Sequence, residues 1–137
     1  MNNELITCML RELEEINTFC TKEFKDSILS LIDTDVKKFI SVFKSDFQLN
    51  NIDEYNRFEK LSLTPIQKRK IDNNILYRYE YRRSNKNIKC IFILDCEDNC
   101  KILLLAFSED GDKKKGNDSY KFNIERAIKI YRNLKGE

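Results

Sequence analysis

Apolar residues recur at helical spacing in three stretches of the first 50 residues. Residues 3–17 repeat an apolar side chain every three or four positions with Glu and Arg between them, which indicates an amphipathic helix. A similar pattern runs from about residue 21 to residue 31. Residues 33–35 (Asp-Thr-Asp) then offer N-caps for a third helix, whose apolar stripe ends at Phe47. We interpret all three stripes as faces that pack on a core rather than as ligand-binding surfaces.

Residues 51–74 follow neither a helical nor a strand pattern throughout. They include the single proline of the chain, Pro65, and the residue before a proline is biased to an extended conformation. Residues 67–70 (Gln-Lys-Arg-Lys) are basic. We interpret residues 51–74 as a partly ordered basic connection.

The strongest local pattern begins at Ile75, where side chains alternate with period two, as in a strand. One face would carry Ile75, Tyr77, Tyr79 and Tyr81, and the other Arg78, Glu80 and Arg82. Residues 88–94 and 101–107 are apolar on both faces and follow short polar turns, so we expect them to be the inner strands of an antiparallel meander. A lysine-rich loop over residues 108–118 and a closing helix that ends at Gly136 complete the pattern.

These patterns predict an α+β fold, in which N-terminal helices pack on a small antiparallel β-meander and a C-terminal helix closes the chain. A length of 137 residues suits one domain. Within it, residues 1–50 would form the helical part, residues 51–74 the connection, and residues 75–137 the meander with its helix.

The composition limits the chemistry of any active site. The chain has no His, which excludes a Ser-His-Asp or Cys-His nucleophile and a His general base. Its five cysteines fit no disulfide framework, and a zinc site would have no His ligand. We therefore expect no metal and no cofactor. The sequence has no apolar run long enough to span a membrane and an acidic N-terminus unlike a signal peptide, so we expect a cytoplasmic protein.

Charge is divided unevenly along the chain. Residues 1–54 carry a net charge of −5 and residues 55–137 a net charge of +7. Ten Lys or Arg side chains fall between residues 57 and 89, interleaved with tyrosines. Cations neutralise phosphates and aromatic faces stack on unpaired bases, so this region is a candidate RNA-binding surface. The alternative is a solvated surface with the tyrosines in the core, and for the tyrosines we favour the core.

A cation cluster is expected where the first two strands meet. Lys89 would start the second strand close to Arg82 and Arg83, and three adjacent cations require an anion or a carboxylate. Glu80 is on the same expected face as Arg82 and can satisfy one of them. The candidate RNA-binding residues are Lys68, Arg69, Arg78, Arg83, Lys113 and Lys114.

The order of these segments resembles the RelE/ParE toxin superfamily of type II toxin–antitoxin systems. The resemblance rests on residues 76–82, 89–93 and 103–107, on the lysine loop, and on residues 123–127, and it covers about residues 56–134. Two features depart from the family pattern. The family opens with a β-strand before two helices, whereas this chain is expected to open with a helix. Lys89 stands where the family carries an Arg on the second strand.

The resemblance implies a RelE-like mRNA endoribonuclease that acts on the ribosome without a metal, by attack of a 2′-hydroxyl on the adjacent phosphate. Poisoning of gyrase is the other activity that it implies. The catalytic residues would be Arg82 and Lys89, which clamp the phosphate, and Tyr120, which stacks or relays a proton. The partners would be mRNA, the ribosome and a cognate antitoxin, in the bacterial cytoplasm and away from membranes.

Three other functions stay open. A protein of this fold could be a non-catalytic RNA- or ribosome-binding module, or a degenerate toxin. Its acidic helical part could instead bind a protein partner, with no nucleic acid involved. A small-molecule enzyme is disfavoured, because the sequence has no glycine-rich phosphate loop and no set of metal ligands.

Overall fold

The computed structural model describes residues 2–32, 36–49, 51–83, 86–95, 97–108 and 116–136, without the side chains of residues 2, 3, 83, 86 and 116–120. Its elements are α1 (Asn2–Glu14), β1 (Thr18–Cys20), α2 (Lys22–Leu31), α3 (Val36–Phe47), a 3₁₀ turn η1 (Ile52–Glu54), β2 (Phe58–Lys60), α4 (Pro65–Lys70), β3 (Ile75–Arg83), β4 (Lys86–Asp95), β5 (Cys100–Ser108) and α5 (Gly116–Leu134). The expected α+β class is confirmed.

A five-stranded sheet in the order β1-β5-β4-β3-β2 forms the middle layer. Strands β3, β4 and β5 are joined in sequence and pair antiparallel, which confirms the expected meander with β4 and β5 inside. A three-residue strand extends each edge. β2 pairs antiparallel with β3, whereas β1 pairs parallel with β5, so the sheet is mixed.

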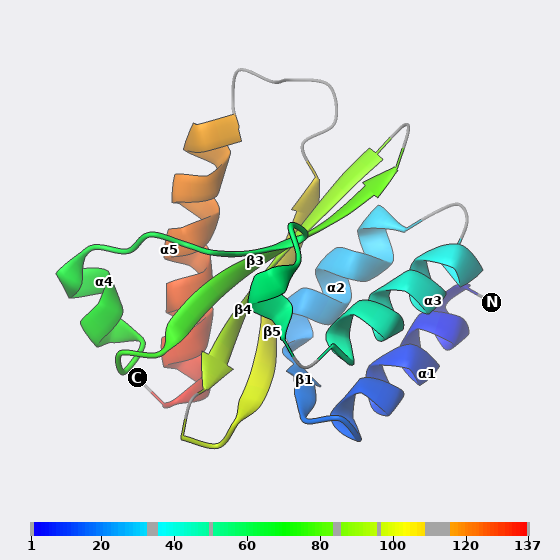
Figure 1. Ribbon diagram of the computed structural model, residues 1–137, viewed down its shortest axis with the longest axis horizontal. Helices are drawn as coiled ribbons and strands as arrows, with labels where there is room; N and C mark the ends of the chain where they lie inside the picture. The colour runs from blue at the N-terminus through cyan, green and yellow to red at the C-terminus, as the bar shows by residue number, and fades with distance from the viewer. Residues whose placement is uncertain are drawn as a thin grey trace.

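Helices cover both faces of this sheet. Helices α1, α2 and α3 lie on one side, and α4 and α5 on the other (Figure 1). The larger core lies under α1–α3, and a smaller core lies under α5, where Ala127, Ile128 and Tyr131 are buried against β4 and β5. No described helix is both long and apolar enough to cross a membrane.

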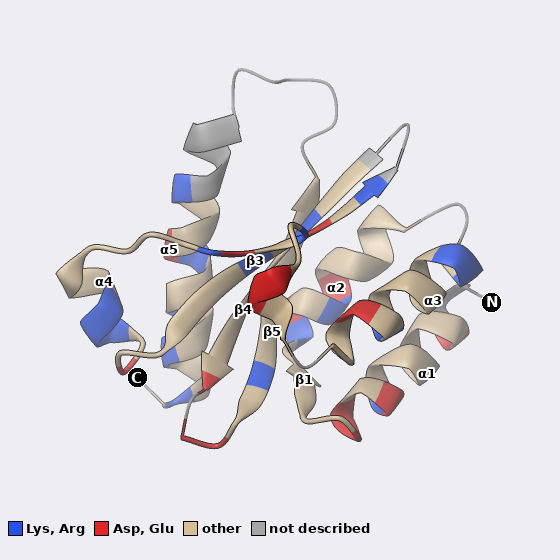
Figure 2. Cartoon of the chain, in the orientation of Figure 1, with Lys and Arg blue, Asp and Glu red and all other residues tan. Residues whose placement is uncertain are grey.

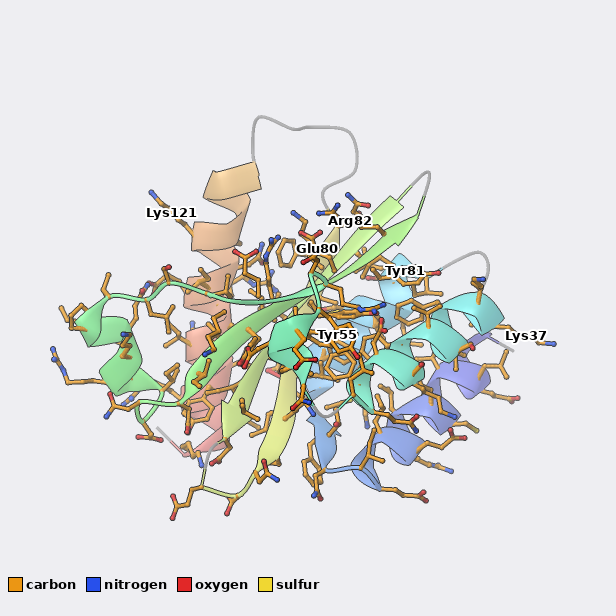
Figure 3. All side chains as sticks on the ribbon, in the orientation of Figure 1. Lys37, Tyr55, Glu80, Tyr81, Arg82 and Lys121 are labelled. Carbon is orange, nitrogen blue, oxygen red and sulfur yellow. The ribbon has the colours of Figure 1, made fainter. Side chains whose placement is uncertain are left out.

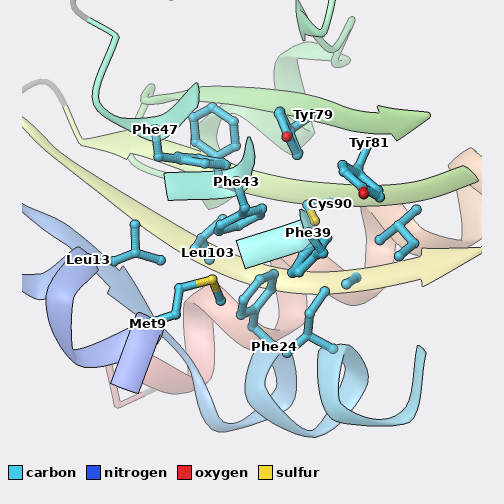
Figure 4. Packing of buried hydrophobic residues seen from close by; sticks show 14 of the residues in the cluster. Met9, Leu13, Phe24, Phe39, Phe43, Phe47, Tyr79, Tyr81, Cys90 and Leu103 are labelled. Atoms are coloured by element: carbon cyan, nitrogen blue, oxygen red, sulfur yellow. The ribbon is translucent and has the colours of Figure 1, made fainter. Parts of the chain in front are cut away.

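Aromatic rings fill the larger core. The Phe47 ring lies 4.6 Å from that of Phe43 and 5.1–5.5 Å from those of Phe58, Tyr79 and Phe92, measured between centroids. Figure 4 shows Phe43, Phe47 and Tyr79 close together between the sheet and the helices. The tyrosines of β3 point into this core, each less than a tenth exposed, which confirms the core interpretation for them.

The segment interpreted as a connection has more structure than expected. Within residues 51–74 the chain forms η1, β2 and α4. Helix α4 has a capping box, in which the Thr64 hydroxyl accepts from the Gln67 N–H and the Gln67 side chain accepts from the Thr64 N–H. Pro65 is at its first turn, where a proline needs no hydrogen-bond partner. Thus Thr64 is extended as expected, but Pro65 starts a helix.

Candidate functional site

Four charged side chains meet on the face of the sheet that carries α5. The Glu80 carboxylate forms ion pairs with Arg78 and with Arg82, whose Nε lies 2.7 Å from Oε2. The Nζ of Lys89 lies 3.6 Å from Oε1 of the same carboxylate. We refer to Arg78, Glu80, Arg82 and Lys89 as the Glu80 cluster. Figure 2 shows basic and acidic positions close together in the middle of the sheet, around β3.

Strand geometry explains the cluster. Residues two apart on a strand share a face, so Arg78 and Arg82 flank Glu80. The register of β3 and β4 places Lys89 directly opposite Glu80. Arg78 also forms an ion pair with Glu59 of β2, so the network joins three neighbouring strands.

The members of the Glu80 cluster differ greatly in exposure. The side chains of Glu80 and Lys89 are 7% and 10% exposed, whereas that of Arg82 is 74% exposed. Arg82 therefore presents most of its side chain to solvent, whereas Lys89 is largely buried. Figure 3 shows Arg82 next to Glu80 at the upper end of the sheet.

The electrostatics keep Glu80 ionised. Burial on its own would raise the pKa of this carboxyl, but the hydrogen bond from Arg82 and the charges of Arg78, Lys89 and Arg82 outweigh burial and lower its pKa. The cluster is thus an ionised carboxylate surrounded by three cations. An anion that approached Arg82 would meet an excess of positive charge.

A cleft of about 580 Å³ opens beside the Glu80 cluster, at the edge of β3 beyond the end of β2. It is lined by Lys38, Val42 and Asp46 of α3, by residues 54–57 and by residues 79–82. Glu80 and Arg82 thus belong to both the cluster and the cleft. The charged side chains of the lining are three cations and three carboxylates.

A second buried carboxylate, Asp46, also lines this cleft. The Tyr79 hydroxyl donates to its Oδ2 (2.6 Å), and the Arg57 guanidinium lies 3.0 Å from its Oδ1. Burial, followed by the hydrogen bond to Asp46, raises the pKa of Tyr79, so this phenol stays protonated as a donor. Arg57 also lies over the Tyr55 ring, 5.2 Å from its centroid.

The structure brings only some of the sequence-predicted site residues together. Arg78, Arg82 and Lys89 meet at Glu80. Lys68 and Arg69 lie on α4, which contacts α5 through the hydrogen bond between Gln67 and Glu125, away from the cluster.

The remaining candidates are only partly described. Arg83 pairs with Lys86 across β3 and β4, but its side chain is not described. Tyr120 lies in the first turns of α5, again without a described side chain. Lys113 and Lys114 lie outside the described residues.

Among the residues of the site region that were not candidates are Asp46, Tyr55, Arg57 and Glu59. Their partners lie 2 to 33 positions away in the sequence, and only β2 and the end of α3 bring them to β3. The sequence signal for β2 was the single apolar residue among charged ones in residues 57–60 (Arg-Phe-Glu-Lys), which fits a short edge strand.

In the described part of the chain, no three side chains of the metal-binding types come together. Comparisons of the chain with protein families, with curated proteins and with solved structures found no match.

Proposed function

We propose that this protein binds single-stranded RNA at the Glu80 cluster and cleaves it as a RelE-like, ribosome-associated endoribonuclease. The observation that supports this most is an ionised carboxylate 2.7 Å from a guanidinium that is 74% exposed. A guanidinium that is held in place by a carboxylate and open to solvent can stabilise the charge that develops on a phosphate during 2′-hydroxyl attack.

The cluster supplies a role for each group in that reaction. Glu80 orients Arg82 and does not act as the base, because its two oxygens are held by Arg78, Lys89 and Arg82. The ribose 2′-hydroxyl gives its proton to water as its oxygen attacks the adjacent phosphorus. Arg82 hydrogen-bonds the phosphate oxygens, which gain charge in the transition state. The bond from phosphorus to the 5′-oxygen then breaks, that oxygen takes a proton from water, and a 2′,3′-cyclic phosphate remains. Lys89 holds the carboxylate in place from the neighbouring strand.

The order of elements supports the RelE-like assignment. A strand followed by two helices is the opening expected of the family, and β1, α2 and α3 follow one another in that order. Helix α1 then precedes this unit as an addition. The meander and α5 follow in the order on which the resemblance rests. Action on mRNA in the ribosome would place the protein in the cytoplasm, with an antitoxin that covers Arg82.

A non-catalytic RNA-binding module is the second candidate. The low exposure of the Glu80 cluster favours this function, because Glu80 and Lys89 are each no more than a tenth exposed and are paired with each other. In that case Arg82 alone would reach a phosphate, and no 2′-hydroxyl attack would follow.

A reporter mRNA in a bacterial translation extract distinguishes these functions. The proposal predicts mapped cuts with the wild-type protein, and loss of those cuts with Arg82→Ala and with Glu80→Gln. Glu97→Gln makes the same charge change in the turn between β4 and β5, at the opposite end of the strands, and should cut normally. If a double variant with Arg82→Ala and Lys89→Ala still arrests growth and still cuts mRNA, the proposed mechanism is wrong.

A further inference from the structure

We infer that the cleft between α3 and β3 seats one unpaired base of the bound RNA, and that it selects guanine. This inference rests on the proposed function, because the phosphate of the same nucleotide would lie on Arg82. It adds a base-binding site to the Glu80 cluster and names the residues that would give it specificity.

The charge of the cleft suits a neutral base better than a phosphate. Its lining has three cations and three carboxylates, so it has no net attraction for a second anion. Two of the cations, Arg57 and Arg82, already bind the carboxylates Asp46 and Glu80. Its volume of about 580 Å³ lies within the range of small-molecule sites.

Tyr55 provides a flat surface for stacking. Its ring is half-buried, it lines the cleft, and the Arg57 guanidinium covers part of it. Hydrogen bonds fix the backbone around it, because the Tyr55 N–H donates to Ile52 and its carbonyl accepts from Phe58. The Glu80 N–H also donates to the Arg57 carbonyl, which joins this segment to β3. Unpaired RNA bases stack on such aromatic and guanidinium surfaces.

Glu54 supplies the selectivity. Both Asp46 oxygens are occupied, one by Tyr79 and the other by Arg57. Glu54 also lines the cleft, is exposed, and forms no ion pair with any side chain in the described ranges. A free carboxylate accepts two parallel hydrogen bonds, and among the four RNA bases only guanine presents two adjacent N–H donors, N1–H and N2–H₂, on its pairing edge.

The cleft and the Glu80 cluster are positioned to bind one nucleotide. Glu80 and Arg82 line the cleft from β3, while Tyr55 lines it from the segment after η1 (Figure 3). Arg82 lines the cleft where the edge of β3 is no longer covered by β2, so a phosphate that it holds at this edge would leave its attached base at the entrance to the cleft. Tyr55 would then stack on the face of the base, and Glu54 would accept hydrogen bonds from its pairing edge.

The test measures binding of four short single-stranded RNAs, each with one G, A, C or U in a uniform abasic background, to full-length protein carrying Glu80→Gln. That substitution removes the carboxylate that orients Arg82 and so prevents cleavage under the proposed mechanism, which means that binding is measured on intact RNA. We expect the G-containing RNA to bind at least tenfold more tightly than the others. Glu54→Gln should remove the preference for G, and Tyr55→Ala should weaken binding of all four RNAs.

The matched variant is Glu97→Gln, which removes a carboxylate outside the cleft and should keep the preference. Equal binding of the four RNAs, or a preference for G that survives Glu54→Gln, would overturn the inference, even if the wild-type protein cleaves RNA. A preference for G without cleavage by the wild type would support the base site and contradict the proposed catalysis.

Discussion

Glu80 and Lys89 face each other across β3 and β4, with Oε1 and Nζ 3.6 Å apart and both side chains nearly buried. Arg82, two residues after Glu80, shares the carboxylate but remains in solvent. One buried anion thus positions one exposed cation. This relationship determines what each substitution in the cluster should do.

Removal of the Glu80 carboxylate should destabilise the fold more than removal of Arg82. Glu80→Ala leaves two largely buried cations, Arg78 and Lys89, without the carboxylate that they share, and we expect a loss of about 2–3 kcal/mol in the free energy of unfolding. Arg82→Ala should cost less than about 1 kcal/mol, because that side chain is mostly exposed. Urea denaturation of both variants measures the difference, and equal losses would contradict it.

Acid should weaken the contribution of Glu80 to stability. Its pKa in the folded protein lies below the ordinary value of 4.5, so its contribution is fully present above that value and is lost as the pH falls through the folded pKa. The stability difference between wild type and Glu80→Gln should therefore be largest near neutral pH and shrink below about pH 4.5. Denaturation at several pH values tests this prediction. A stability difference between the two proteins that grows in acid would contradict it.

Phe47 should be one of the most sensitive positions of the aromatic core. Its ring contacts four other rings and is about 1% exposed, so Phe47→Ala leaves a cavity and should cost about 3–5 kcal/mol. Phe19→Ala is the control, because Phe19 lies on the edge strand β1 and is 41% exposed. Its loss should stay below about 1 kcal/mol. Thermal or urea unfolding measures both, and a small loss at Phe47 would contradict the packing.

The cysteines should react with thiol reagents in the order of their exposure. Cys8 is exposed on α1, whereas burial raises the pKa of the Cys90 thiol, which lies in the larger core. Burial raises the pKa of Cys20 to about 12. Of these three, iodoacetamide should therefore modify Cys8 first and reach Cys90 only after unfolding. Peptide mass spectrometry follows each site, and early modification of Cys90 would place β4 at the surface.

The long elements could be predicted because each repeats a pattern over nine or more residues. The helices α1–α3 have apolar stripes, and β3 alternates from Ile75 to Arg83. Strands β1 and β2 have only three residues each, too few for a period to emerge, and their pairing with β5 and β3 is a tertiary property. Helix α4 has no buried residue and hence no stripe. Its capping box at Thr64 and Gln67 was the available signal.

The part of the candidate site that lies within the β-meander could be predicted from the sequence, but its contacts with α3 and with the segment before β2 could not. Alternation placed Arg78, Glu80 and Arg82 on one face, and the turn length brought Lys89 near them. The sequence suggested that Glu80 can satisfy one cation, whereas it contacts all three. Asp46, Arg57 and Tyr55 meet at β3 only because α3 packs on the sheet and β2 ends early. Periodic patterns in the sequence give no information on such contacts.

The most direct measurement of the central claim is the chemistry of the RNA ends. A single-stranded oligoribonucleotide incubated with purified protein and ribosomes in excess chelator for Zn²⁺ and Ca²⁺ should yield a 2′,3′-cyclic phosphate, and a 2′-deoxy substitution at the cut position should abolish cleavage. Both results should depend on Glu80 and Arg82. No cleavage, a cut that survives 2′-deoxy substitution, or wild-type products from Glu80→Gln would contradict the account.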